Sequence, residues 1–347
     1  MKRLLTVICV LSLSAIFACQ ACAADDLEGE TVQQRSLERV ESVVYGAPGS
    51  GGMLIRLARV ERDLFGMELP GTLTERQQAL LNFVETGTPT QPSLIFKIGV
   101  AEWVTLSKVN PSVSLSDRIA NLETTLEGET QAGALSSRLE RILTKLLPSG
   151  VTSLSVQIPA GTVFKAAFAK TLTVRTVKVG DIVELNVTED CITDGTLAVA
   201  KGDRVFAEVT KVRLPRSFGR TSEIGVEFRE IESLGGELFG VTMGERAKKA
   251  MQIDSGTIGA VGTSLVGAIL VGPLGLAGGF LVRGNDKQIP EGSLVYVETV
   301  SDAGVTGYPT FGASDPANGN AAPQGEESPD FVPIDDGASQ GPPTDSF

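Results

Sequence analysis

The feature that most constrains this chain is an uncharged, glycine-rich stretch at residues 258–282. Seven of its 25 residues are glycine, and none of its side chains carries a charge. A helix of about 20 apolar residues can span the hydrocarbon core of a bilayer, so length alone is compatible with a membrane span. Pro273, however, has no backbone N–H and disfavours a helical conformation at Gly272. We therefore predict two short helices, at about residues 256–271 and 274–283, that form a hairpin.

Small residues recur mostly every three to five positions along this stretch. Such spacing gives helix faces on which two backbones can approach closely. We expect these faces to pack in a membrane or against a second copy of the chain. The residues predicted to form this contact are Gly259, Gly262, Gly267, Gly272, Pro273, Gly275, Gly278 and Gly279.

Two similar turns support a hairpin over a straight span. Residues 158–162 (IPAGT) precede Val163 and Phe164, and residues 289–293 (IPEGS) precede the apolar run 294–300. If both turns lead into strands of one β domain, the glycine-rich stretch must leave that domain and return to it. A hairpin returns, whereas a single span does not. Two alternatives stay open: a hairpin packed only on its own domain, and a single transmembrane helix.

The first 23 residues have the pattern of a secretory signal peptide. A basic start is followed by an apolar run at residues 4–17 and by Ala21-Cys22-Ala23, a typical cleavage site. We predict cleavage after Ala23 and a location in the periplasm or at the outer membrane; lipidation of Cys19 is the alternative. Cleavage leaves Cys191 as the one cysteine of the mature chain, so no intramolecular disulfide can form.

Residues 35–150 carry an internal helical repeat after a polar lead at residues 24–34. Each copy combines an apolar helix face, a glutamate, two glycines five positions apart and a downstream arginine. The first glycine is expected to end the helix because it adopts the left-handed conformation freely. Helices this short are stable only when they stack. The predicted helix caps of the three copies are Gly46, Gly66 and Gly128, and the glutamates and arginines are Glu41 and Arg56, Glu61 and Arg76, and Glu123 and Arg138.

A more apolar insert, residues 80–109, separates the second and third copies and is expected to supply the core of this domain. The repeat suits a module that oligomerises or binds a partner. A small helical domain with no partner is the alternative.

From residue 151 the pattern changes to short, mostly alternating apolar segments separated by glycine turns. This pattern predicts a small β-barrel or sandwich at residues 151–300, with the glycine-rich hairpin (256–283) inserted in it. Residues 301–347 hold eight acidic residues and no lysine or arginine. We expect this segment to be a solvated, disordered tail. The fold class is therefore α+β, with short-helix repeats first and the β domain second.

The composition excludes several kinds of chemistry. Histidine is absent, so neither a Ser-His-Asp triad nor a Cys/His zinc site can be built. Removal of residues 1–23 changes the net charge from −12 to −14, which disfavours nucleic acid as a partner. The loop at residues 46–52 lacks the Gly-Lys-Ser/Thr ending of a phosphate loop. We expect no enzyme activity, no cofactor and no metal.

Some charged groups have two interpretations. The pairs Glu189 with Asp190 and Glu230 with Glu232 could act as acid and base, but solvated strand ends explain them better. A basic cluster between two strands could bind anionic headgroups or polymer, although an exposed loop is the simpler interpretation. Its members are Lys211, Arg213, Arg216 and Arg220.

The order of segments in residues 151–300 resembles the C-terminal domain of TrbI-like proteins of type IV secretion and conjugation machinery. The resemblance rests on the two Ile-Pro-x-Gly turns, a Lys201-Gly-Asp strand entry, the apolar excursion and the final valine-rich strand. It implies a modified β-barrel with an inserted helical hairpin, many copies of which form a ring through the outer membrane. Residues 256–283 would then cross the membrane. The chain departs from that family before residue 151, where a cleavable signal and helical repeats replace an inner-membrane helix.

These observations lead to two hypotheses. The first is an exported, non-enzymatic envelope scaffold that self-associates, contacts an envelope partner, and packs its hairpin into a ring or the outer membrane. The second is a soluble periplasmic binding or adaptor module whose hairpin stays folded on its own domain. A hydrolase that uses paired carboxylates is a third hypothesis, for which we find no positive support.

Overall fold

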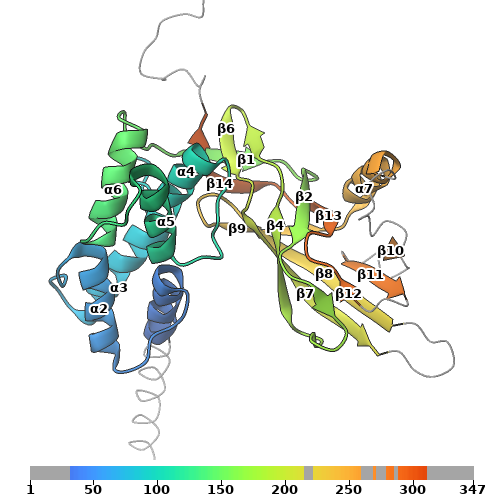
Figure 1. The fold of residues 1–347 in the computed structure, drawn as a ribbon, viewed down its shortest axis with the longest axis horizontal. Helices are drawn as coiled ribbons and strands as arrows, with labels where there is room; N and C mark the ends of the chain where they lie inside the picture. Colours follow the sequence, from blue (N-terminus) through green and yellow to red (C-terminus); the bar gives the residue numbers. More distant parts are fainter. Residues whose placement is uncertain (1–31, 215–221, 259–268, 271–278, 285–287, 311–347) are drawn as a thin grey trace, which may run out of the picture. The chain divides into compact units, whose positions relative to one another are not determined.

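The computed structural model describes residues 32–214, 222–258, 269–270, 279–284 and 288–310. Within these residues the chain is α+β, with helices first and a β part second, as the sequence predicted (Figure 1). The β part contains a small closed barrel, which decides between the two architectures that the strand pattern left open. The helical and β parts belong to one compact unit.

The helical part consists of short helices that end in left-handed caps or tight turns. A first helix covers residues 32–45. It is followed by α2 (Met53–Phe65), α3 (Leu73–Leu81), a short π-helix η1 (Asn82–Thr86), α4 (Leu94–Leu106), α5 (Leu115–Glu127) and α6 (Leu135–Leu146).

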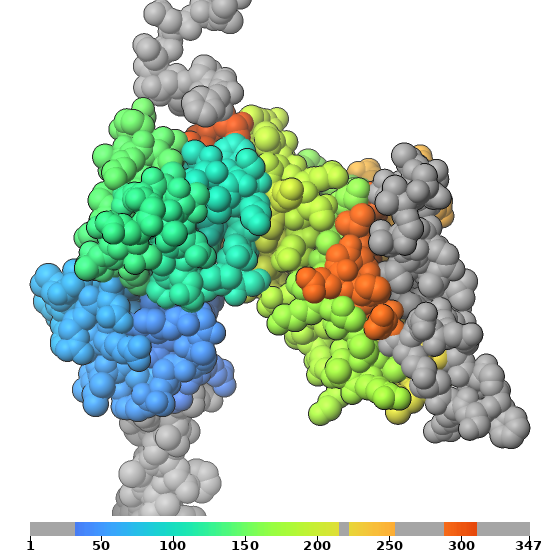
Figure 2. Space-filling view, viewed as in Figure 1, coloured from blue at the N-terminus to red at the C-terminus, as the bar shows by residue number. Residues whose placement is uncertain are grey.

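One apolar cluster joins these helices. It contains fully buried side chains from early and late helices, among them Leu57 and Leu64 of α2, Ile119 of α5 and Leu139 of α6. The early helices (blue) and the later ones (green) adjoin each other in the space-filling view (Figure 2). The insert at residues 80–109 therefore does not supply the core by itself. Each helix contributes one face, because helices of this length are not stable alone.

The six-stranded barrel is formed by β8, β7, β4, β2, β13 and β9, which pair in that order, and β9 closes it by pairing again with β8. A second, four-stranded sheet has the order β1, β14, β6, β5, and β12 pairs with β3. The strands are β1 (Leu154–Ile158), β2 (Val163–Phe168), β3 (Leu172–Thr173), β4 (Ile182–Val187), β5 (Cys191–Thr193), β6 (Thr196–Val199), β7 (Arg204–Arg213), β8 (Ser222–Glu232), β9 (Leu238–Thr242), β10 (Ile269–Leu270), β11 (Gly279–Gly284), β12 (Gln288–Ile289), β13 (Leu294–Thr299) and β14 (Ala303–Pro309).

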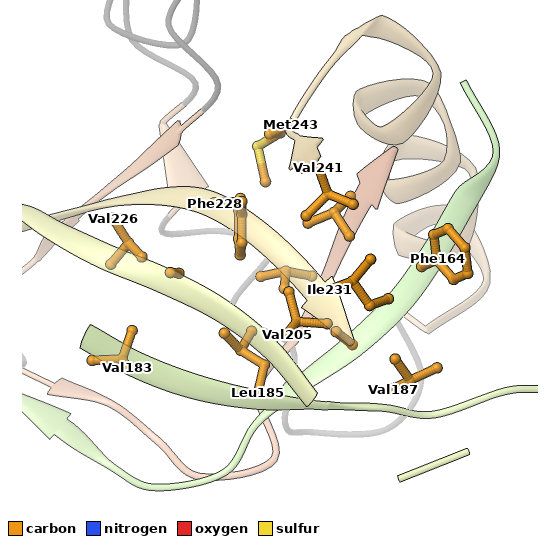
Figure 3. Close-up of a cluster of buried hydrophobic side chains, with 14 of the residues drawn as sticks. Phe164, Val183, Leu185, Val187, Val205, Val226, Phe228, Ile231, Val241 and Met243 are labelled. Carbon is orange, nitrogen blue, oxygen red and sulfur yellow. The ribbon is translucent and has the colours of Figure 1, made fainter. Parts of the chain in front are cut away.

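Alternation along the strands fills the barrel. Every second residue of β4 faces inward, so Val183, Leu185 and Val187 are buried while the residues between them are partly exposed. These side chains meet Val205 of β7 and Phe228 of β8 inside the barrel (Figure 3). The interior is therefore a packed apolar core, as expected for a small barrel.

Four turns of the β part share one geometry. In each, the third residue is a glycine with φ between 75° and 101°, and the fourth residue donates its N–H to the carbonyl of the first. A type II turn needs a positive φ at this position, so glycine is favoured there. The turns are residues 159–162, 178–181, 200–203 and 290–293.

The two Ile-Pro-x-Gly turns lead into neighbouring strands. β2 and β13 pair antiparallel, with Phe164 opposite Val297. Gly161 donates its N–H to the carbonyl of Thr299 at 2.9 Å, so the turn before β2 is bonded to the end of β13. The prediction that both turns enter one β domain is confirmed.

The end of the β part lies further along the chain than the sequence suggested. We expected residues 301–347 to form a solvated tail, but Ala303–Pro309 form strand β14, which pairs with β1 and β6. Val305 and Tyr308 of this strand are buried. The strand was missed because its partners lie more than 100 residues earlier in the chain.

A third apolar cluster connects the helical and β parts. It includes Phe96 and Val100 of α4, Leu197 of β6, Leu234 and Tyr308. These contacts explain why α4 is the most apolar helix of the described residues: it packs on both the helical core and the β part.

Candidate functional site

The candidate site is the excursion between β9 and β13, where the sequence placed the glycine-rich hairpin. Helix α7 (Glu245–Ile258) follows β9, and β11 precedes β12 and β13. The chain therefore leaves the barrel and returns to it, as predicted. The two predicted helices, 256–271 and 274–283, are wrong at residues 269–270 and 279–283, which lie in strands. The helix at the entry, α7, begins before the predicted start and ends at Ile258. Seven predicted contact residues lie outside the described residues: Gly259, Gly262, Gly267, Gly272, Pro273, Gly275 and Gly278.

Pairing with β8 explains why residues 279–284 form a strand. Strand β8 pairs with β9 only near its end, at Glu230–Glu232. The start of β8 extends past β9, and β11 pairs with it antiparallel from Ser222 to Glu227. Gly279 lies opposite Glu227. Glycine is a poor helix former, so a strand partner overrides the weak helical tendency of this segment.

Helix α7 is fastened to the barrel at its first turn. The Glu298 carboxylate of β13 accepts the N–H of Ala247 at 2.6 Å and so satisfies a free N–H at the helix start. Arg246 donates to the carbonyl of Gly161 at 3.2 Å, in the turn before β2. Ala247 is fully buried. The entry of the excursion is thus held by an acid from β13 and by a turn carbonyl.

Gly244 lies directly against Glu298, so a side chain at residue 244 would displace this carboxylate. A Cβ atom at residue 244 would fall 1.8 Å from a carboxylate oxygen of Glu298. On the next turn of α7, Met251 packs against the barrel core, as does Met243 before the helix. The start of the excursion therefore has a fixed position on the barrel.

The predicted caps of the repeat lie at helix ends. Gly46, Gly66 and Gly128 have φ values of 85°, 79° and 84°, in the left-handed region. The N–H of Gly66 bonds the carbonyl of Arg62, and the N–H of Gly128 bonds that of Thr124. These glycines are far from the excursion in the chain. The predicted site residues therefore fall into two groups, one in the excursion and one at the helix ends of the repeat.

The repeat also contains a buried ion pair in each copy, which the sequence analysis did not interpret. The glutamate of one helix binds the arginine of the next helix and accepts an N–H from the loop between them. In the third copy, Arg138 Nε lies 3.0 Å from Glu123 Oε1, and the N–H of Gln131 lies 3.0 Å from Oε2. One carboxylate therefore fixes both the next helix and the loop before it.

The signal for this pair was present in the sequence. Glu41 follows Leu37 by four positions and precedes Val44 by three, so it lies on the apolar face of its helix. A charged residue on a buried face needs a partner, because an isolated buried charge is strongly destabilising. The arginine 15 positions later is that partner in all three copies.

A fourth copy lies in the insert that the sequence analysis set apart. Glu102 of α4 binds Arg118 of α5 with distances of 3.0 and 2.7 Å and accepts the N–H of Asn110. Ser107 takes the place of the cap glycine and has a φ of 55°. The loop is one residue longer than in the other copies, so alignment on the glycines does not reveal it.

The four copies form two sets of three helices. Glu41 and Glu102 are 61 positions apart, and Glu61 and Glu123 are 62 positions apart. The last helix of each set has leucine at the glutamate position, Leu81 in α3 and Leu143 in α6. The ion-pair series therefore ends after the third helix of each set.

The arginines and loop N–H groups favour the ionised form of the glutamates Glu41 and Glu123. Burial opposes the ionised form of Glu123, but the hydrogen bonds from Arg138 and Gln131 outweigh it, so the pKa of Glu123 lies below its ordinary value. Burial is likewise outweighed at Glu41 by Arg56 and by the N–H of Gly49, and its pKa is also lowered. Both carboxylates are therefore held in the ionised form.

Two of the four acidic residues considered for acid–base chemistry, Glu232 and Asp190, make structural contacts. Glu232 forms an ion pair with Arg204 at 2.6 Å. Asp190 accepts the Nε1–H of Trp103 at 2.9 Å and the N–H of Lys201 at 2.7 Å. A small pocket of about 230 Å³ lies elsewhere, beside α6, and is lined in part by Lys97 and Glu140, which are ion-paired.

Comparisons with known proteins give little further information. No protein-family model matches this chain, and no curated protein matches it. Among solved structures, it is similar to ComB10 of the Com type IV secretion system of Helicobacter pylori. The sequence identity is 14% and the TM-score is 0.22, and the match covers 42% of this chain and 88% of the ComB10 chain. Among the described residues, no helix combines the length and apolar character that a membrane crossing requires.

Proposed function

We propose that this protein is an exported, non-enzymatic scaffold of the cell envelope that self-associates through the excursion between β9 and β13. The observation that carries the proposal is the attachment of this excursion at both ends. Its entry is held by Glu298 and Arg246, and its exit is strand β11, which belongs to the barrel sheet. An excursion with both ends fixed can offer the same surface in every copy of the chain, as self-association requires.

The targeting signal and the composition agree with this role. The first 23 residues have the pattern of a cleavable secretory signal. The chain lacks histidine, and the mature segment has one cysteine, so stability must come from packing and from buried ion pairs. The helical part, with its repeated pairs, is suited to bind a second protein of the envelope.

A second candidate is a periplasmic adaptor whose excursion stays on its own barrel. The pairing of β11 with β8 over six residues favours it, because that part of the excursion already has a partner within the same chain. The two candidates differ in what residues 259–278 contact.

Extraction of the native envelope with carbonate or urea, followed by sizing, separates the two candidates. The variant carries Gly267→Leu and Gly275→Leu, which block close packing without reducing hydrophobicity. The control carries Gly319→Leu and Gly337→Leu in the C-terminal segment. A scaffold predicts that wild type and control resist extraction as a large assembly and that the variant loses this assembly. Extraction of the wild type as a monomer would establish the adaptor.

A further inference from the structure

Two equivalent turns of the barrel differ in what covers them. In each, the aspartate at the fourth position accepts the N–H of the first residue at 2.7 Å: Asp181 from Lys178, and Asp203 from Ala200. The first turn is exposed, with Asp181 only partly covered. In the second, Asp203 has 3% of its surface exposed. The same local structure therefore holds one accessible carboxyl group and one buried group.

The helical part covers the second turn. The N–H of Val109, in the loop between α4 and α5, bonds the carbonyl of Lys201 at 2.8 Å. The turn glycine, Gly202, lies so close that a Cβ atom there would be 1.9 Å from the Val109 carbonyl oxygen. The equivalent Gly180 has no heavy atom within 4 Å of such a position. This loop belongs to the one copy of the repeat that has the longer loop, so the added residue coincides with docking on the barrel.

The charged groups that act on Asp203 lie on α5, β7 and β8. Arg118 of α5 is already bound by Glu102 of α4. Arg204 of β7 is bound by Glu232 of β8, and Glu184 of β4 also acts on it. Both nearby cations therefore have carboxylate partners. Asp203 is therefore a third carboxyl group beside two cations whose charges are already neutralised by Glu102 and Glu232.

Burial raises the pKa of Asp203 well above its ordinary value, and Glu232 adds to the rise. The N–H of Ala200 and the cations Arg118 and Arg204 act in the opposite direction without reversing it. Because the Val109 loop lies against the neighbouring Gly202, we expect movement of the helical part to hydrate the Asp203 carboxyl group, so that the carboxylate form costs less.

We propose that the contact between the helical part and the barrel is a proton-linked latch, closed when Asp203 is protonated and weakened when Asp203 ionises. The closed state has the higher proton affinity, so closing takes up a proton. The stabilisation is complete below the ordinary aspartate pKa of about 3.9 and is lost as pH rises through the raised value of the closed state.

The chain contains its own reporter of this contact. Trp103 is its single tryptophan. It donates to Asp190 of the β part and lies edge-on to Tyr308, with ring centroids 6.1 Å apart. Opening of the latch would expose the indole ring to water, and its fluorescence emission would shift to longer wavelength.

The test is urea titration of the full chain at pH 5 and pH 8, followed by Trp103 fluorescence, for the wild type, Asp203→Asn and Asp181→Asn. Asparagine keeps an acceptor for the turn N–H but cannot ionise. We expect the Trp103 midpoint to fall to lower urea at pH 8 in the wild type and in Asp181→Asn, and to change much less in Asp203→Asn. An equal fall in all three proteins, or no fall in the wild type, would overturn the latch.

A glycine pair provides the open reference state. Ala has no room at residue 202, whereas at residue 180 it meets only the strain of a positive φ of 92°. We expect Gly202→Ala to give red-shifted Trp103 emission at both pH values with native far-UV circular dichroism, and Gly180→Ala to keep the wild-type emission. Native emission in Gly202→Ala would contradict the docking that the latch requires. If Gly202→Ala does not fold, the pH dependence of the Trp103 midpoint in Asp203→Asn and Asp181→Asn still tests the latch.

Discussion

Glu61 and Arg76 lie on consecutive helices, 15 residues apart, and form a bidentate ion pair in which the glutamate side chain has no exposed surface. Arg76 Nε is 2.8 Å from Oε1, and the loop N–H of Leu69 is 3.2 Å from Oε2. The pair therefore joins α2 to α3 and fixes the loop between them. Removal of Arg76 would leave the fully buried Glu61 carboxylate without its charged partner.

We expect Glu61→Gln to lower the free energy of unfolding by about 3 kcal/mol, because it breaks a buried pair and leaves Arg76 with the more distant, half-exposed Glu68 at 3.7 Å. The control is Glu129→Gln, at an exposed loop position, with an expected change within about 0.5 kcal/mol. Urea denaturation followed by circular dichroism measures both. Equal effects of the two substitutions would show that the buried pair adds nothing specific.

Stability should fall at acidic pH because the pKa values of Glu41 and Glu123 are lowered in the folded state. A lowered folded-state pKa gives stability that is complete above the unfolded pKa of about 4.3 and is lost as pH falls through the folded value. Urea midpoints between pH 6 and pH 3 should therefore drop in the wild type. Glu123→Gln should show a smaller drop, and Glu129→Gln the full one. A drop in Glu123→Gln as large as in the wild type would show that protonation of Glu123 does not cause the loss of stability at acidic pH.

The cap positions predict opposite signs for two reciprocal substitutions. Gly128 has a φ of 84° and open space around it, so Gly128→Ser should lower stability by about 1 kcal/mol through backbone strain alone. Ser107 already has a positive φ, 55°, so Ser107→Gly should raise stability by about 0.5 kcal/mol after the entropy cost of glycine. Thermal denaturation measures both, and two changes of the same sign would contradict the repeat assignment of Ser107.

The anchor of α7 can be tested by hydrogen exchange. Glu298→Ala removes the acceptor of the Ala247 N–H, a charged hydrogen bond worth about 1.5 kcal/mol, so the first-turn amides of α7 should exchange about tenfold faster. The control is Glu245→Ala, whose side chain is 89% exposed and pairs with Lys248. Unchanged exchange in Glu298→Ala would mean that apolar packing alone positions the helix.

Local patterns predicted the elements whose partners lie nearby in the chain. Glycine spacing indicated the caps at Gly66 and Gly128, and alternation indicated strands such as Ile182–Val187. The shared Ile-Pro-x-Gly turns indicated that β2 and β13 belong to one β domain, in which the structure pairs them. In each case, the residues that determine the structure are a few positions apart.

Long-range contacts account for what the sequence did not indicate. Strand β11 depends on the overhang of β8, and β14 depends on β1 and β6, so local propensity was not sufficient. The pair of Glu102 and Arg118 was missed because Ser107 replaces the glycine on which the copies align. Asp203 is buried although its turn has the same local structure as the turn that holds Asp181, so its burial has no local signal.

The leucines that end the ion-pair series, Leu81 and Leu143, make the helical part divisible. In the last helix of each three-helix set, leucine occupies the glutamate position, and leucine needs no charged partner in a following helix. Loss or gain of one set would leave no buried acid without its base, although it would also remove or add a face of the shared apolar core. Length in this part of the molecule can therefore change in modules of about sixty residues while every buried acid keeps its base.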